Sequence, residues 1–170
     1  AAIVNASSTY VNTTINIDSN SSSYGVNATG FSAGAIQFYG TGASLAELTI
    51  TSGTVSSQIT GSLDGTVSLI DVDESSPIIN VGQNTGNSGS ITNSTIGGNA
   101  IYFSGSNAIS FTLNVNATGT ISSEGNAITL QDSSASSNLT LNNAGTISAG
   151  AGFSAISLDG YSAEITNSGS

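Results

Sequence analysis

Apolar residues alternate with small polar ones in short stretches along most of the chain. The clearest stretches are LTI at 48–50, FTL at 111–113, LTL at 139–141 and ISL at 156–158. A period of two places every second side chain on one face, which predicts short, half-buried β-strands. Gly, Asn, Asp and Ser separate these stretches and supply turns at low steric cost. Since no helical spacing of apolar residues persists beyond two turns, we predict an all-β chain.

Two phrases recur at a nearly constant interval. NAIYF at 99–103 returns as NAITL at 126–130 and, less closely, as SAISL at 154–158. The steps between their alanines are 127 − 100 = 27 and 155 − 127 = 28. TGTIS at 118–122 returns as AGTIS at 144–148, and Gly169 begins a third copy. Repeats of this length indicate a stack of units, each of which buries its apolar face against its neighbours.

Three short strands in each unit of about 25 residues are what a parallel β-helix, or β-solenoid, requires. The 170 residues would then make about seven coils. An antiparallel sandwich also uses many short strands, but it does not need the two phrases to recur at one step. We therefore favour the solenoid, with an N-terminal strand or cap segment at 1–30 and β-helix repeats at 31–170.

Composition narrows the range of partners. Only 6% of residues are charged and there is one proline, so the low apolar fraction of 37% does not by itself indicate disorder. The chain has no Lys, Arg or His and a net charge of −10. Such a surface repels phosphate backbones and anionic lipid, so we exclude nucleic acid and anionic membranes as partners. No apolar run approaches the roughly 20 residues that span a bilayer.

Most catalytic chemistry is excluded because its residues do not occur in the chain. Without His, Cys, Lys or Arg there is no nucleophile–base pair, arginine clamp or zinc–histidine site, so we predict that the protein is not an enzyme. Only carboxylates remain. Asp71 and Asp73 lie two apart, and a glycosidase built on such a pair is a distant alternative.

The same carboxylates have a second interpretation. Asp71, Asp73 and Glu74 offer clustered oxygen ligands, which suit Ca²⁺. The competing interpretation is a solvated acidic loop ahead of Pro77. Calcium is therefore the one cofactor that the sequence suggests, and otherwise we expect none.

The repeats also resemble a known group of proteins. LTITSGTVS at 48–56, LTLNNAGTIS at 139–148 and ITNSG at 165–169 look like the repeats of autotransporter passenger domains and related bacterial surface adhesins. The resemblance is clear over 90–170, fainter over 33–57 and absent from 1–30. It implies a right-handed parallel β-helix that is exported to the bacterial cell surface for adhesion or aggregation. Ala1 and Ala2 look either like the small-residue edge left by signal-peptide removal or like the start of a shortened chain.

The two ends of the predicted stack are candidate assembly sites. The first segment alternates well but lacks the repeated phrases, so it is either a cap or a strand donated to a neighbouring subunit; its candidate residues are Tyr10, Val11, Ile15 and Ile17. At the other end, Ile165 and Asn167 would lie on an open coil whose unpaired backbone groups invite edge pairing.

These features together predict a non-catalytic, extracellular structural rod of a bacterial surface. It would either assemble head to tail with copies of itself into fibres or form part of a longer adhesin. The alternative is a carbohydrate-binding adhesin module that recognises host or matrix glycans. The five tyrosines are candidate sugar-stacking residues, although scattered tyrosines more often pack within strands.

Overall fold

In the part of the chain that the structure describes, the alternating residues form sixteen β-strands and no residue lies in a helix. The structure is a computed structural model that describes residues 3–6, 11–18, 25–28, 34–39, 43–58, 65–70, 76–105, 109–132 and 137–170. Every strand pair is parallel, as the solenoid prediction requires and the antiparallel sandwich does not.

Three parallel sheets run along the stack. Sheet A consists of β1 (Ile3–Ala6), β4 (Ile36–Tyr39), β6 (Gly65–Ile70), β9 (Asn99–Gly105), β12 (Ile128–Asp132) and β15 (Ile156–Asp159). Sheet B consists of β2 (Val11–Asp18), the first part of β5 (Ala43–Ser57), β7 (Ile78–Val81), β10 (Ser110–Val115), β13 (Ser137–Asn143) and β16 (Tyr161–Asn167). Sheet C consists of β3 (Gly25–Ala28), the last part of β5, β8 (Gly89–Asn93), β11 (Thr120–Ser123) and β14 (Thr146–Ser148).

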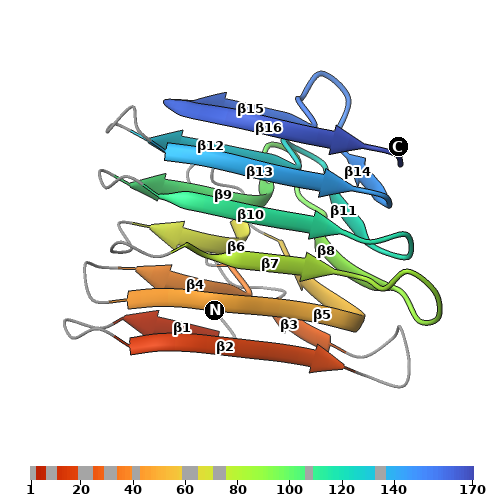
Figure 1. Cartoon of the computed structure of the whole chain (residues 1–170), viewed down its shortest axis with the longest axis horizontal. Helices are drawn as coiled ribbons and strands as arrows, with labels where there is room; N and C mark the ends of the chain where they lie inside the picture. Colours follow the sequence, from red (N-terminus) through yellow and green to blue (C-terminus); the bar gives the residue numbers. More distant parts are fainter. Residues whose placement is uncertain are drawn as a thin grey trace.

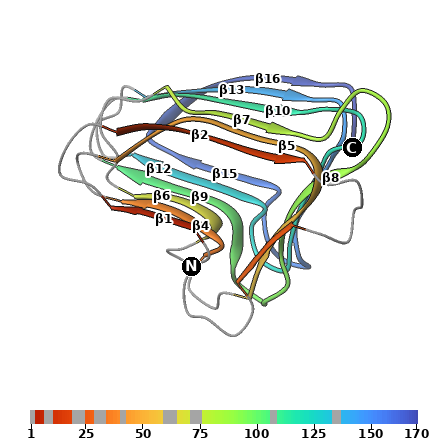
Figure 2. The same cartoon turned by 90° about the horizontal axis from the view of Figure 1, so that it is seen from below.

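The chain winds through sheets A, B and C in turn and then climbs to the next level. In Figure 1 the front strands of sheet B point to the right, the rear strands of sheet A point to the left, and the chain rises from β1 to β16. This path is a right-handed coil, and Figure 2 shows the same coil from below, with the sheets around a common interior. The predicted right-handed parallel β-helix is therefore confirmed.

Equivalent apolar side chains from successive coils stack in columns inside the sheets. One column of sheet B holds Leu48, Ile79, Leu113 and Leu141, which pair in register and are each at most 1% exposed. Complete burial of such a side chain contributes roughly 1.5–3 kcal/mol. Because each coil adds one member to every column, the core runs continuously along the stack.

The repeated phrases mark equivalent places in successive coils. Ile101, Ile128 and Ile156 pair in register in sheet A, and Thr120 pairs with Thr146 in sheet C. The interval between copies of a phrase is therefore the length of one coil. The stack has six levels in sheet A, so the expectation of about seven coils is too high. The reason is that each coil is longer than the sequence estimate assumed.

A glycine recurs in the second phrase because two coils approach each other closely there. A Cβ atom at Gly119 would lie closer than 3.0 Å to the carbonyl oxygen of Val81, one coil below. A Cβ at Gly145 would meet the carbonyl oxygen of Gly119 in the same way. Only a residue without a side chain allows the backbone to pass at this corner between sheets B and C.

Candidate functional site

The outward face of sheet B carries a chain of side-chain hydrogen bonds that crosses several coils. Asn142 Nδ2 donates to Asn114 Oδ1 over 2.9 Å, and Asn114 Nδ2 donates to Asn80 Oδ1 over 2.8 Å. These three residues pair in register on β13, β10 and β7. We call them the amide ladder. Each amide in the ladder donates toward the N-terminal end of the stack.

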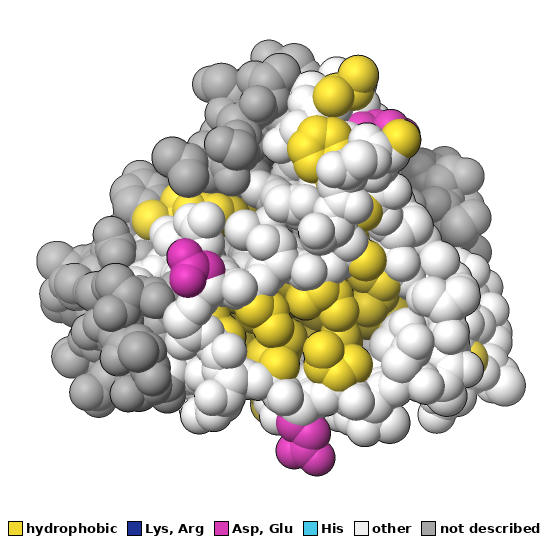
Figure 3. Space-filling view, turned by 90° about the horizontal axis from the view of Figure 1, so that it is seen from above, with side chains coloured by type: hydrophobic (Ala, Val, Ile, Leu, Met, Phe, Trp, Pro, Cys, Tyr) yellow, Lys and Arg dark blue, Asp and Glu magenta, His cyan; other side chains and the backbone are white. Residues whose placement is uncertain are grey.

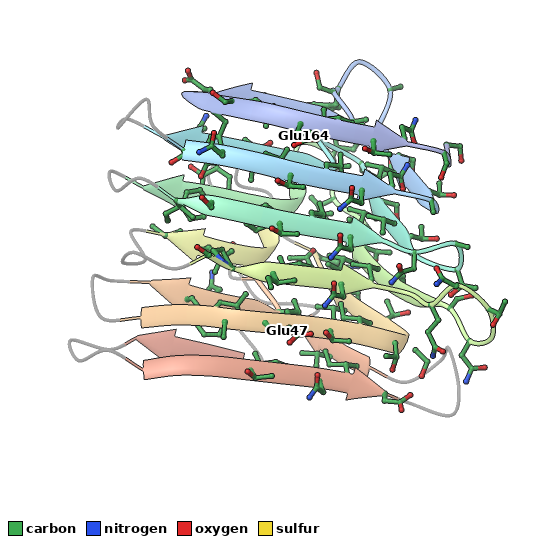
Figure 4. All side chains as sticks on the ribbon, in the orientation of Figure 1. Glu47 and Glu164 are labelled. Carbon is green, nitrogen blue, oxygen red and sulfur yellow. The ribbon has the colours of Figure 1, made fainter. Side chains whose placement is uncertain are left out.

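The amide ladder ends on a carboxylate. Asn80 Nδ2 donates to Glu47 Oε1 over 2.9 Å and to Thr49 Oγ1 over 3.0 Å, and Thr49 Oγ1 itself donates to Glu47 Oε1 over 2.6 Å. An ionised carboxylate only accepts hydrogen bonds, so Glu47 can end a series of side chains that each donate toward it. Figure 4 shows Glu47 and Glu164 on this same face, near opposite ends of the stack.

A second polar column lies at the corner between sheets B and C. The inward positions of the middle coils there are Val81 and Val115, but the next two coils place Asn143 and Asn167 in the same column. Asn143 Nδ2 donates to Asn167 Oδ1 over 2.8 Å. These two corner asparagines therefore stack from coil to coil.

The asparagines of the other repeated phrase are connected indirectly. Thr129 Oγ1 donates to Asn99 Oδ1 over 2.8 Å and accepts from Asn126 Nδ2 over 3.2 Å. A threonine hydroxyl therefore links Asn99 to Asn126 across one coil. These contacts fix the corner between sheets C and A, and they engage polar groups that would otherwise lack partners.

A concave trough of about 350 Å³ crosses three coils where sheet C ends. One wall is the outward row Thr92, Ser122 and Ser148, which pair in register on β8, β11 and β14. The other wall includes Ser94 and Glu124, each two residues further along its coil. The trough is lined by uncharged polar residues, small residues and this single carboxylate.

The last coil presents an apolar hollow at the top of the stack. Ile147, Ile156 and Ile165 line it, its volume is about 130 Å³, and Ile165 is 48% exposed. Figure 3 shows a patch of hydrophobic side chains at the centre of this face. We call this top surface of the last coil, with its apolar hollow, the open face. Within the described residues, β15 pairs only with β12 and β16 only with β13, so both strands carry a free edge there.

The structure locates some of the predicted site residues. Asp71, Asp73, Glu74 and Tyr10 lie outside the described residues, so the calcium and glycosidase predictions stay predictions. Val11 pairs with Ala43 in the first coil. Among the described residues, no three Asp or Glu come together as a potential metal group, and no helix is long and apolar enough to cross a bilayer.

The remaining predicted assembly residues lie at the two ends of the stack. Ile15 and Ile17 are half-buried in β2, where they pair with Leu48 and Ile50 and pack on the core. They belong to a coil formed by β1, β2 and β3, which pairs with the next coil of the same chain. Ile165 lies on the open face, and Asn167 lines the same hollow. Their roles in assembly stay predictions.

The trough and the amide ladder were not anticipated from the sequence. Thr49 pairs with Asn80, Asn80 with Asn114 and Asn114 with Asn142, at steps of 31, 34 and 28 along the chain. Because these steps are unequal, a search of the sequence for one repeat length does not find the amide ladder. The row of residues along one wall of the trough could have been recognised in part, because Ser122 and Ser148 are each the last residue of a copy of the GTIS phrase.

Comparison of the chain with protein-family models, curated proteins and solved structures finds no match.

Proposed function

We propose that this chain is a non-catalytic structural rod of a bacterial surface, which assembles into fibres or forms part of a longer adhesin. The open face is the observation that carries the proposal. Free strand edges pair readily with another strand, and the apolar residues of an end coil are buried only when another coil covers them. A further coil, from the continuing polypeptide or from a second copy, would extend the same columns.

The resemblance of the repeats to autotransporter passenger domains supports an extracellular place for this rod. The uniform columns support a mechanical rather than a catalytic role, because each coil repeats the contacts of its neighbour. A carbohydrate-binding function is the second candidate, and the trough of sheet C is the feature that favours it.

The proposal is tested by electron microscopy of the purified chain together with a mass measurement of the particles in solution. The buffer contains about 0.15 M salt, which shortens the Debye length to about 8 Å and weakens repulsion between acidic subunits. We expect filaments of uniform width. Monodisperse particles with the mass of one chain would rule out the fibre and leave the adhesin segment.

A pair of variants connects assembly to the open face. Ile165→Asp places a charge in the apolar hollow and should abolish filaments, because an unpaired charge is costly to bury. Ile96→Asp makes the same change at a side chain that is 78% exposed on a corner loop, and it should leave filaments intact. Equal effects of the two variants would contradict a specific role for the open face.

Calcium is tested in the same experiment. If Asp71, Asp73 and Glu74 bind calcium that assembly requires, chelator should dissolve the filaments and added calcium should restore them. Filaments that are insensitive to chelator would instead support the solvated acidic loop.

A further inference from the structure

The trough is concave because, in each of the successive coils that form it, one residue that points inward lies between two residues that point outward. On β8 and β11 the outward residues are Thr92 and Ser122, and the next residue of each coil, Asn93 or Ser123, points inward and is buried. The chain then faces outward again. The buried row is thus the floor of a channel that runs along the stack, across strands about 4.8 Å apart.

The polar groups of the floor are already engaged by the fold. Asn93 Nδ2 donates to the Asn99 carbonyl oxygen over 2.9 Å, and Asn93 Oδ1 accepts from the Thr95 amide over 3.0 Å. Ser123 Oγ donates to the Gly98 carbonyl and accepts from the Gly125 amide. These bonds fix the floor, so the trough exists before any ligand arrives.

The side chains of the walls differ from those of the floor in their hydrogen bonding. Within the described residues, no side-chain hydrogen bond is made by the five wall residues Thr92, Ser94, Ser122, Glu124 and Ser148. Ser94, Glu124 and Ser148 are exposed, and the other two are half-buried. Four hydroxyls and one carboxylate therefore face a preformed channel whose volume is at the lower end of the range for small-ligand sites.

The chemistry of the walls points to a ligand rich in hydroxyl groups. Hydroxyls of Thr and Ser both donate and accept, as sugar hydroxyls do, and the Glu124 carboxylate accepts from sugar hydroxyl donors. The trough has no cation to hold an acidic sugar, and the net charge of −10 repels anions. We propose that the trough binds a neutral glycan, with the sugar chain lying along the stack and Glu124 as its principal acceptor.

This site lies on the side of the rod and does not depend on assembly. It extends the proposed surface function by naming a partner, but neither the open face nor a filament contributes to it. Filament formation and glycan binding can therefore succeed or fail separately, and each has its own variants.

Isothermal titration calorimetry of the full chain tests the site. The probes are neutral tetrasaccharides of glucose, mannose, galactose and N-acetylglucosamine, with tetragalacturonate as the anionic comparison. We expect at least one neutral probe to bind and the anionic probe not to bind. Glu124→Gln should weaken binding about tenfold, because hydrogen bonds to a charged acceptor are stronger than those to a neutral one.

Two matched controls localise the effect. Glu164→Gln makes the same change on the exposed face of sheet B and should leave binding unchanged. Ser122→Leu fills the middle of the trough and should abolish binding, whereas Thr120→Leu, on the same face of β11 but outside the trough, should not. Circular dichroism of each variant checks that the fold is retained.

Two results would overturn the proposal. The first is that no neutral probe binds; if a tetralysine peptide then binds in a manner sensitive to Glu124→Gln, the trough is assigned to basic peptides. The second is that glycan binding is unchanged by both Glu124→Gln and Ser122→Leu.

Discussion

The lower and upper halves of the stack form the same kind of coil from segments of different length. In sheet A, equivalent residues of the lower coils are Ile3, Ile36 and Val67, at steps of 36 − 3 = 33 and 67 − 36 = 31, and the step on to Ile101, where the upper half begins, is 101 − 67 = 34. In the upper coils the steps from Ile101 to Ile128 and on to Ile156 are 128 − 101 = 27 and 156 − 128 = 28. The sheets nevertheless continue across both halves.

Part of the difference in length lies in the corners between strands. Between β7 and β8 the chain uses the segment 82–88, whereas between β13 and β14 it uses only 144–145. The cost of closing a loop grows slowly with its length, so the fold tolerates this variation. Coil identity is thus set by the columns of inward side chains, and the sequence interval can vary.

The largest expected effect tests whether the two halves are equivalent. Phe38 in the lower half and Phe103 in the upper half occupy one column of sheet A, and both are fully buried. Phe38→Ala and Phe103→Ala should each lower the free energy of unfolding by about 3–5 kcal/mol because each leaves a cavity. Urea unfolding followed by circular dichroism measures both. A loss at Phe103 with none at Phe38 would show that only the upper half is a packed solenoid.

The next effect concerns a short corner of the upper half. Gly145→Ala forces a Cβ against the carbonyl oxygen of Gly119 and should lower the free energy of unfolding by about 1–3 kcal/mol. Ala144→Ser, at the exposed neighbouring position, is the control and should change it little. Equal stabilities of the two variants in urea would mean that the corner can relax around a methyl group.

A smaller effect concerns the contact that crosses both halves. Asn114→Ala interrupts the amide ladder, removing its hydrogen bonds to Asn80 and Asn142, and should lower the free energy of unfolding by about 1 kcal/mol. Asn84→Ala, on an exposed corner, is the control and should have no measurable effect. If thermal unfolding does not distinguish the two variants, the ladder adds order to the surface without stabilising it.

The smallest effect is expected at a corner loop. Ile96 is 78% exposed, so Ile96→Ser should change the free energy of unfolding by less than about 0.5 kcal/mol. A larger loss, measured in urea beside the wild-type chain, would reveal packing of this loop that its exposure does not indicate.

The fold class was predictable because alternation and repetition report directly on strand faces and coil length. The upper coils are similar in length, 27 and 28 residues between equivalent isoleucines, so the phrases at Ala100, Ala127 and Ala155 kept a visible interval. In the lower half the corners differ in length, so the same coil does not appear in the sequence as a regular repeat. This explains why the segment 1–30 showed no repeat although β1, β2 and β3 form a coil. The number of coils was overestimated for the same reason.

The candidate sites were less predictable because they depend on which residues the coils bring together. Asn80 and Asn114 are far apart in the sequence, and nothing in their local sequence marks them as partners. The trough needs Thr92, Ser122 and Ser148 in one row and Glu124 beside them, which only the register provides. The two corner asparagines, Asn143 and Asn167, differ in this respect, because they stand in similar local phrases, NNAG at 142–145 and TNSG at 166–169.

The parallel pairing of successive coils should also make the mechanical strength of the stack depend on the direction of the force. Backbone hydrogen bonds between strands run along the stack, so tension applied between its two ends loads these weak bonds coil after coil. A force applied across one coil is carried instead by covalent backbone. Under axial pull, the coils should peel away singly from an end, each releasing the stretch of chain between equivalent positions, such as Ile101 and Ile128. We therefore expect a stack of this kind to yield in small steps and to lengthen greatly before it breaks.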